Sequence, residues 1–140
     1  MRRPEELLIE ACLPVLPAGS GVGYAEDRRT SIYPQAAALA AVTVVDGLVS
    51  AAAIGLVNAG PCPVRARAAE GEVVGKPLSD SVITAAAECA AAVDGRGRPA
   101  FRTLARRALT QARDRVRCEV PRARSGAQMG LQDQGSGAGG

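Results

Sequence analysis

The sequence predicts a small α+β domain in which an antiparallel sheet of three to four strands is covered on one face by about three helices. Two apolar runs, residues 36–45 and 48–57, are joined by Asp46-Gly47, a dipeptide typical of β-hairpin turns. In the second half of the chain, apolar residues recur at intervals of three and four, as in amphipathic helices. Because strand-like segments come first and helix-like segments follow, the pattern favours α+β over α/β.

The length of 140 residues is enough for one domain with one modest core. Hydrophobic residues make up 47% of the chain but aromatic residues only 2%, so alanine and aliphatic side chains must build that core. We expect residues 1–119 to form the domain. Residues 120–140 are rich in Gly, Ser and Gln without periodicity, and we expect them to be a disordered tail.

The N-terminal segment begins like a signal peptide, with two arginines before an apolar stretch. Three glutamates interrupt that stretch, so we expect a cytoplasmic protein instead. No apolar run is long enough to span a membrane. The alternation in residues 7–12 predicts the first strand, ended by Pro14 and Pro17.

A glycine-punctuated segment follows, with Gly19, Gly21 and Gly23 at alternate positions. It is not flanked by a strand and a helix in the order that a phosphate-binding loop requires, so we interpret it as a flexible loop. Residues 24–29 are polar and are expected to lead into a turn at 28–31. The hairpin of residues 36–45 and 48–57 comes next.

Three helices are expected after the hairpin. The first covers residues 64–74 and ends at Gly75. The second begins after an N-cap at Ser79 or Asp80 and ends near residue 93. The third begins near Pro99, and its single phenylalanine, Phe101, is expected to be a buried anchor.

The residue inventory excludes several kinds of chemistry. Four cysteines are scattered without a CxxC pair, and the chain has no histidine. We therefore expect no metal site and no histidine-dependent catalysis from this chain alone. The cysteines are expected to be buried, reduced thiols that act as small apolar side chains.

Arginines crowd the third predicted helix and could form a phosphate-binding stripe. The net charge is only +3, however, and few aromatic residues are available to stack on bases. A solvated helix face, or one that docks on an acidic partner subunit, is the favoured interpretation. We expect neither a nucleic-acid partner nor a membrane partner.

The segment from Gly55 to Leu78 carries a pattern of spaced residues: Gly60, Pro63, Arg65, Glu70, Gly75, Pro77 and Leu78. In this pattern and its order, the chain resembles the C-terminal domain of the flavin (medium) subunit of molybdenum hydroxylases, the carbon monoxide dehydrogenase and xanthine dehydrogenase family. Further similar motifs are Arg28-Arg29 followed by Ile32-Tyr33-Pro34, and Phe101-Arg102 followed by Arg106-Arg107-Ala108-Leu109.

The resemblance implies an accessory domain that supports FAD-mediated electron transfer without catalytic residues of its own. Its implied partners are a flavin-binding domain or chain and the iron–sulfur and molybdopterin subunits of the complex. The loops that hold the FAD pyrophosphate in this family lie in preceding domains. FAD is therefore expected with a separate flavin-binding domain and not in the isolated chain, which is not expected to be active alone.

The resemblance also places Arg28 and Arg29 near the isoalloxazine ring of FAD, where a guanidinium would favour the anionic reduced flavin. Ile32 stands where the family usually has Asp, so that contribution to the flavin is not expected here. Without the family, Arg28-Arg29 would be a solvated turn, and Arg65 with Glu70 a surface ion pair. The alternative function is a small α+β protein-interaction module with no redox role.

Overall fold

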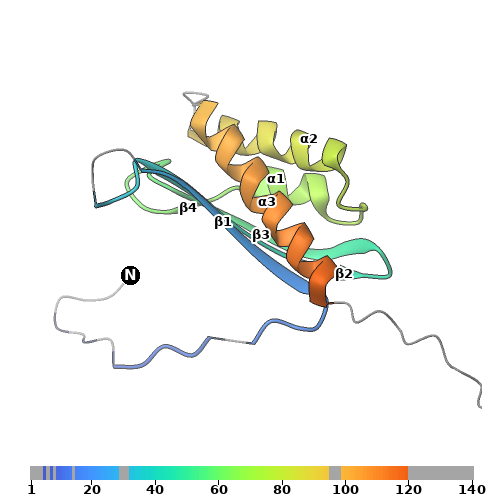
Figure 1. The fold of residues 1–140 in the computed structure, drawn as a ribbon. Helices are drawn as coiled ribbons and strands as arrows, with labels where there is room; N and C mark the ends of the chain where they lie inside the picture. Colours follow the sequence, from blue (N-terminus) through green and yellow to red (C-terminus); the bar gives the residue numbers. More distant parts are fainter. Residues whose placement is uncertain are drawn as a thin grey trace, which may run out of the picture.

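A computed structural model describes residues 5, 7, 9–13, 15–28, 32–94 and 99–119 (Figure 1). Four strands form one antiparallel sheet in the order β1-β2-β3-β4. Helices α1 and α3 lie against one face of this sheet, and α2 packs on both of them (Figure 1). The predicted α+β class is confirmed. The elements are β1 (Ser20–Asp27), β2 (Ala36–Val45), β3 (Leu48–Val57), β4 (Val64–Arg65), α1 (Arg67–Val73), α2 (Asp80–Ala91), the short 3-10 helix η1 (Ala92–Asp94) and α3 (Pro99–Glu119).

The central hairpin is formed by the predicted residues. Strands β2 and β3 pair from Ala37↔Val57 to Val45↔Leu48, with a two-residue turn at Asp46-Gly47. Both turn residues have positive φ, 52° for Asp46 and 80° for Gly47. Positive φ at both positions is what a tight turn between twisted strands requires. The hairpin prediction is confirmed.

The prediction for the first strand is wrong. Residues 9–13 are not assigned to a strand, and β1 is instead formed by Ser20–Asp27, the segment interpreted as a flexible loop and a polar lead into a turn. A Cβ atom on Gly21 would lie 2.0 Å from the carbonyl oxygen of Ala112, and one on Gly23 would lie 1.9 Å from that of Ala108. These glycines therefore permit a close approach of strand and helix, which has no signature in the local sequence.

The helices differ from the prediction mainly at their ends. Val64 and Arg65 extend the sheet as β4, so α1 starts at Arg67, later than expected. Gly75 has a φ of 78° and ends this segment as predicted. Ser79 is the N-cap of α2, and its Oγ accepts a hydrogen bond of 3.4 Å from the Val82 amide.

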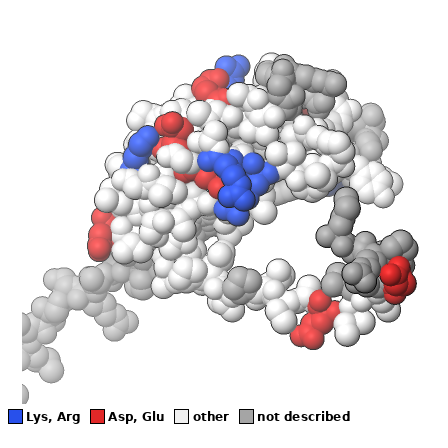
Figure 2. Space-filling view, turned by 180° about the vertical axis from the view of Figure 1, so that it is seen from behind, with Lys and Arg blue, Asp and Glu red and all other residues white. Residues whose placement is uncertain are grey.

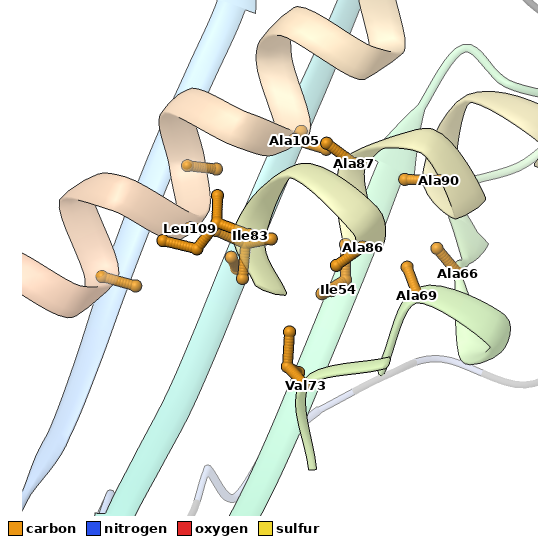
Figure 3. Packing of buried hydrophobic residues seen from close by; sticks show 14 of the residues in the cluster. Ile54, Ala66, Ala69, Val73, Ile83, Ala86, Ala87, Ala90, Ala105 and Leu109 are labelled. Carbon is orange, nitrogen blue, oxygen red and sulfur yellow. The ribbon is translucent and has the colours of Figure 1, made fainter. Parts of the chain in front are cut away.

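The core is built largely from alanine, as the composition requires. Figure 3 shows alanine side chains of α1, α2 and α3 facing one another around Ile54, Ile83 and Leu109. Small side chains let α2 approach α1 and α3 closely, so that a few larger residues fill the space between the helices and the sheet. Phe101 is fully buried, as predicted, and is the largest fully buried side chain.

The described part of the chain contains no helix long and apolar enough to cross a membrane. The prediction of a disordered tail concerns residues 120–140, which lie outside the described residues.

Candidate functional site: the open face of the sheet

None of the described helices lies on the second face of the sheet, which we call the open face (Figure 1). A cross-strand row on this face runs from Tyr24 of β1 through Leu39 of β2 and Gly55 of β3 to Arg65 of β4. Tyr24 is 45% exposed and Leu39 is 46% exposed, although both lie in the middle of their strands. Large side chains this exposed within a sheet indicate a surface that another molecule or domain can cover.

A shallow apolar depression lies beside this row. Its volume is about 280 Å³, and its lining includes Leu39, Ala41, Ala53, Gly55 and Pro63. The small side chains form its centre, so a planar group or a large apolar side chain can lie directly against the strands. On the side of the molecule shown in Figure 2, charged side chains are scattered and much of the surface between them is uncharged.

The N-terminal segment adds further exposed apolar side chains. Leu7, Ile9, Leu13 and Val15 are each at least 81% exposed. These exposed apolar side chains add to the apolar surface of the depression.

Tyr24, Glu26 and Arg28 form a polar row at the β1 end of the open face. Tyr24 Oη donates a hydrogen bond of 2.8 Å to Glu26 Oε2, and Arg28 Nη2 lies 3.0 Å from Glu26 Oε1. The hydrogen bond from Tyr24 is the main cause that lowers the pKa of Glu26, and the guanidinium of Arg28 lowers it further. The hydrogen bond to Glu26 in turn raises the pKa of Tyr24.

The structure therefore places Arg28, the candidate flavin contact, immediately after β1 with its guanidinium paired to Glu26 and half exposed. Arg29 lies outside the described residues. Sequence reasoning missed Tyr24 and Glu26, because residues 24–29 were not interpreted as a strand. Had β1 been predicted, its two-residue periodicity would have placed Tyr24 and Glu26 on one face.

Of the two arginines that the resemblance places near the flavin ring, the structure describes Arg28, whose guanidinium is half exposed. Arg28 can donate hydrogen bonds to the edge of a planar ring beside the open face. A phosphate cradle is not formed by the glycine-punctuated segment, since Gly21 and Gly23 are buried against α3. The glycine-punctuated segment therefore offers no site for the pyrophosphate.

The residues of the Gly55–Leu78 pattern close the outer edge of β3. Glu70 Oε1 accepts hydrogen bonds from the Ile54 amide, at 2.9 Å, and from Arg65 Nε, at 2.7 Å. The Ala66 amide donates to the Ile54 carbonyl at 2.8 Å. The predicted contact between Arg65 and Glu70 exists, but Glu70 is buried, so the expectation of a surface pair needs correction.

Backbone hydrogen bonds close the same edge of β3 further along the strand. The Gly75 amide donates to the Val49 carbonyl at 2.8 Å, and the Val49 amide donates to the Lys76 carbonyl at 3.0 Å. The positive φ of Gly75 turns the chain back toward β3 at this point. Arg65, Glu70 and Gly75 are thus structural residues that satisfy buried or edge backbone groups.

Replacing Glu70 with Gln should flatten the pH dependence of stability in acid. Burial raises the pKa of Glu70, but the hydrogen bonds from Arg65 and Ile54 and the positive charge of Arg65 outweigh it, so the net shift is below the ordinary 4.5. Stability from this ionised group is complete above pH 4.5 and is lost as the pH falls through the lower folded pKa. Urea unfolding between pH 7 and pH 2 measures this, and equal slopes for both proteins would contradict it.

Three of the arginines of α3 make contacts within the domain. Arg102 pairs with Glu88 at 3.2 Å, and Arg113 pairs with Asp80 and Asp114. Arg115 donates to the Val22 carbonyl. Of these three, Arg102 and Arg113 are paired with carboxylates, while Arg106 and Arg107 of the same helix are exposed.

The cysteines are less buried than expected. Cys12, Cys62 and Cys118 are exposed, and Cys89 is partly buried. Cys62 lies in the surface loop between β3 and β4, and Cys118 in the last turn of α3, which leaves them in solvent. Among the described residues, no group of three or more His, Cys, Asp or Glu side chains could hold a metal ion.

Comparison with known proteins identifies this fold. Residues 25–113 match the family model of the CO dehydrogenase flavoprotein C-terminal domain. The chain belongs to this family. The matched range begins within β1 and ends within α3, and it includes β2, β3, β4, α1, α2 and the Gly55–Leu78 pattern. The match therefore confirms the resemblance, inferred from the sequence, to the C-terminal domain of the flavoprotein subunit of molybdenum hydroxylases.

Solved structures support the same assignment. Carbon monoxide dehydrogenase from Hydrogenophaga pseudoflava, in a form that lacks the Mo-pyranopterin moiety of its cofactor, matches with a TM-score of 0.65 and 30% identity over 74% of this chain. Reconstituted CO dehydrogenase from Oligotropha carboxidovorans matches with a TM-score of 0.62 and 30% identity over 74% of this chain. In both cases, this chain covers 40% of the matched chain.

Quinoline 2-oxidoreductase from Pseudomonas putida 86 shares the fold, with a TM-score of 0.62 and 24% identity over 71% of this chain and 39% of the matched one. The sequence has no match among curated proteins.

Proposed function

We propose that this CO dehydrogenase flavoprotein C-terminal domain is an accessory domain of a molybdenum hydroxylase and supports FAD-mediated electron transfer. Its open sheet face docks on a flavin-binding domain or chain, which holds the FAD pyrophosphate. The observation that carries this proposal is the uncovered apolar depression of Leu39, Ala41, Ala53 and Gly55 on the face opposite the helices. A flavin held by that partner would supply the redox chemistry of electron transfer.

Arg28 and Arg29 contribute to this docking from the β1 end of the face. Arg28 lies at the end of a row with Tyr24 and Glu26, with its guanidinium half exposed. A guanidinium beside the isoalloxazine ring stabilises the anionic reduced flavin by charge. Ile32 stands at the position of the family's Asp, so any tuning of the flavin from this segment comes from the arginines.

The wider setting follows from the family. The other partners are the iron–sulfur and molybdopterin subunits, and the complex works in the cytoplasm without a nucleic-acid or membrane partner. We also propose that residues 1–119 belong to the domain and that residues 120–140 do not. A protein-interaction module with no redox role is the second possibility from sequence, and the family assignment does not favour it.

A single change on the open face tests the proposal. We expect Leu39→Asp to reduce the flavin and molybdenum recovered with the affinity-tagged chain from its source cells by at least about tenfold. An aspartate buried against an apolar partner surface costs more than about 1.4 kcal/mol, which corresponds to tenfold in affinity. Flavin fluorescence and metal analysis of the eluate measure the effect.

Ala85→Asp is the matched control, since Ala85 is exposed on α2 in the layer away from the open face. This variant should retain flavin and molybdenum at the level of the unchanged protein. Circular dichroism of both variants establishes that the fold is intact. Equal recovery with Leu39→Asp and Ala85→Asp, or no flavin and molybdenum with the unchanged chain, would refute the proposed docking.

A further inference from the structure

Strand β1 lies at the edge of the sheet, and two of its outward backbone groups, the Tyr24 amide and the Val22 carbonyl, have partners from α3. In an antiparallel pair, successive residues direct their backbone groups alternately toward and away from the neighbouring strand. The Tyr24 amide donates a hydrogen bond of 3.1 Å to Gln111 Oε1. The Val22 carbonyl accepts a hydrogen bond from the guanidinium of Arg115. Both side chains thus occupy groups that a further strand would use.

The distance between Val22 and Tyr24 on β1 is close to the distance between Gln111 and Arg115 on α3. Val22 and Tyr24 are two residues apart on a strand, a distance of about 6.7 Å. Gln111 and Arg115 are four residues apart on a helix, a distance of about 6 Å along its axis. The close approach of α3 at Gly21 and Gly23 brings the helix within reach of this edge.

The two edges of the sheet are closed by different means. On the β3 side, β4, the buried Glu70 and the backbone of Gly75 and Lys76 occupy the outward groups. On the β1 side, the partners that the structure describes for Val22 and Tyr24 are side chains of exposed helix residues. Side chains can be removed by substitution without altering the backbone, so this edge can be opened experimentally.

We propose that Gln111 and Arg115 keep the β1 edge closed to strand addition by a second copy of this chain. Strand β1 has eight residues and no proline, which is long enough for strand addition. Antiparallel pairing of two β1 strands centred on Tyr24 would place Glu26 of one copy opposite Val22 of the other. No like charges would then face each other within the pair.

The double variant Gln111→Ala with Arg115→Ala tests this proposal. We expect its dimer dissociation constant, measured by sedimentation equilibrium, to fall by about tenfold or more relative to the unchanged protein. Hydrogen exchange should show the Tyr24 amide protected in the dimer and exposed in the dilute monomer. Adding Val22→Pro should abolish the dimer, because proline removes an outward donor while pairing with β2 is retained.

Two control proteins separate this effect from loss of charge and from misfolding. Arg106→Ala with Arg107→Ala removes two exposed arginines of the same helix and should leave association unchanged. Gln111→Glu keeps an acceptor for the Tyr24 amide and should remain as monomeric as the unchanged protein. If the double variant does not fold, the single variant Gln111→Ala is tested instead, by sedimentation equilibrium and hydrogen exchange.

A folded double variant that associates no more than the unchanged protein would overturn the proposal. A dimer that persists with Val22→Pro, or in which the β1 amides exchange as in the monomer, would overturn it as well. These outcomes are independent of flavin and molybdenum recovery, so they leave the proposed docking of the open face untouched.

Discussion

Replacing Gly23 with alanine should destabilise the domain by about 3 kcal/mol, the upper end of the usual cost of overpacking. The new Cβ would lie 1.9 Å from the Ala108 carbonyl oxygen, 2.8 Å from the Ala108 carbonyl carbon and 2.9 Å from the Ala112 nitrogen. These are backbone atoms, so α3 as a whole must move away from β1. For a domain of this size, the melting temperature should fall by roughly 12–24 °C.

Gly55→Ala is the matched control within the same sheet. A Cβ at Gly55 would meet no atom within 4 Å. Alanine also restricts the unfolded chain more than glycine does, so the variant should be neutral or stabilised by up to about 1 kcal/mol. Equal melting temperatures for Gly23→Ala and Gly55→Ala would show that α3 does not approach β1 as closely as described.

Replacing Phe101 with alanine should cost about 3–5 kcal/mol. Phe101 is fully buried and is the largest fully buried side chain of a core otherwise built from alanine and aliphatic residues. Small neighbours cannot reach far enough to fill the space left behind, so a cavity would remain. Urea unfolding monitored by circular dichroism measures the change in the free energy of unfolding.

Leu48→Ala serves as its control, since Leu48 is 46% exposed at the β2–β3 turn. We expect a much smaller loss than for Phe101→Ala. If Phe101→Ala left the free energy of unfolding unchanged, the placement of Phe101 at the centre of the core would be wrong.

The Gly55–Leu78 stretch contains residues that stabilise the sheet edge as well as residues of the open face. This stretch identifies the family, and Glu70 and Gly75 within it act on the edge of β3. In the proposed docking, the surface toward the flavin is formed by the segment at Arg28 and by the open face, whose depression includes Gly55 and Pro63 from this stretch. Substitutions of Glu70 or Gly75 should therefore reduce stability before they affect flavin recovery.

Local interactions made much of the fold predictable. The turn at Asp46-Gly47 needs positive φ at both positions, and this dipeptide favours it without help from distant residues. Ser79 as an N-cap and Gly75 as a helix end follow equally from neighbouring residues. Phe101 could be assigned to the core because the chain has no other phenylalanine to occupy it.

Contacts between distant residues account for what sequence reasoning missed. Gly21 and Gly23 look like loop residues until Ala108 and Ala112, more than 80 positions later, are seen to approach them. The row of Tyr24, Glu26 and Arg28 could not be predicted either. These residues share one face only if residues 20–27 form a strand, and that strand was not predicted.

The sequence by itself determined the fold class, the central hairpin, the helical second half and the family. Each of these depends on short-range preferences or on the spacing of residues along the chain. Only the tertiary structure decided that the glycine-punctuated segment is an edge strand, that Glu70 is buried, and that one face of the sheet is open. Those features depend on which backbone and side-chain groups meet across the fold, and their partners lie up to 93 residues away in sequence.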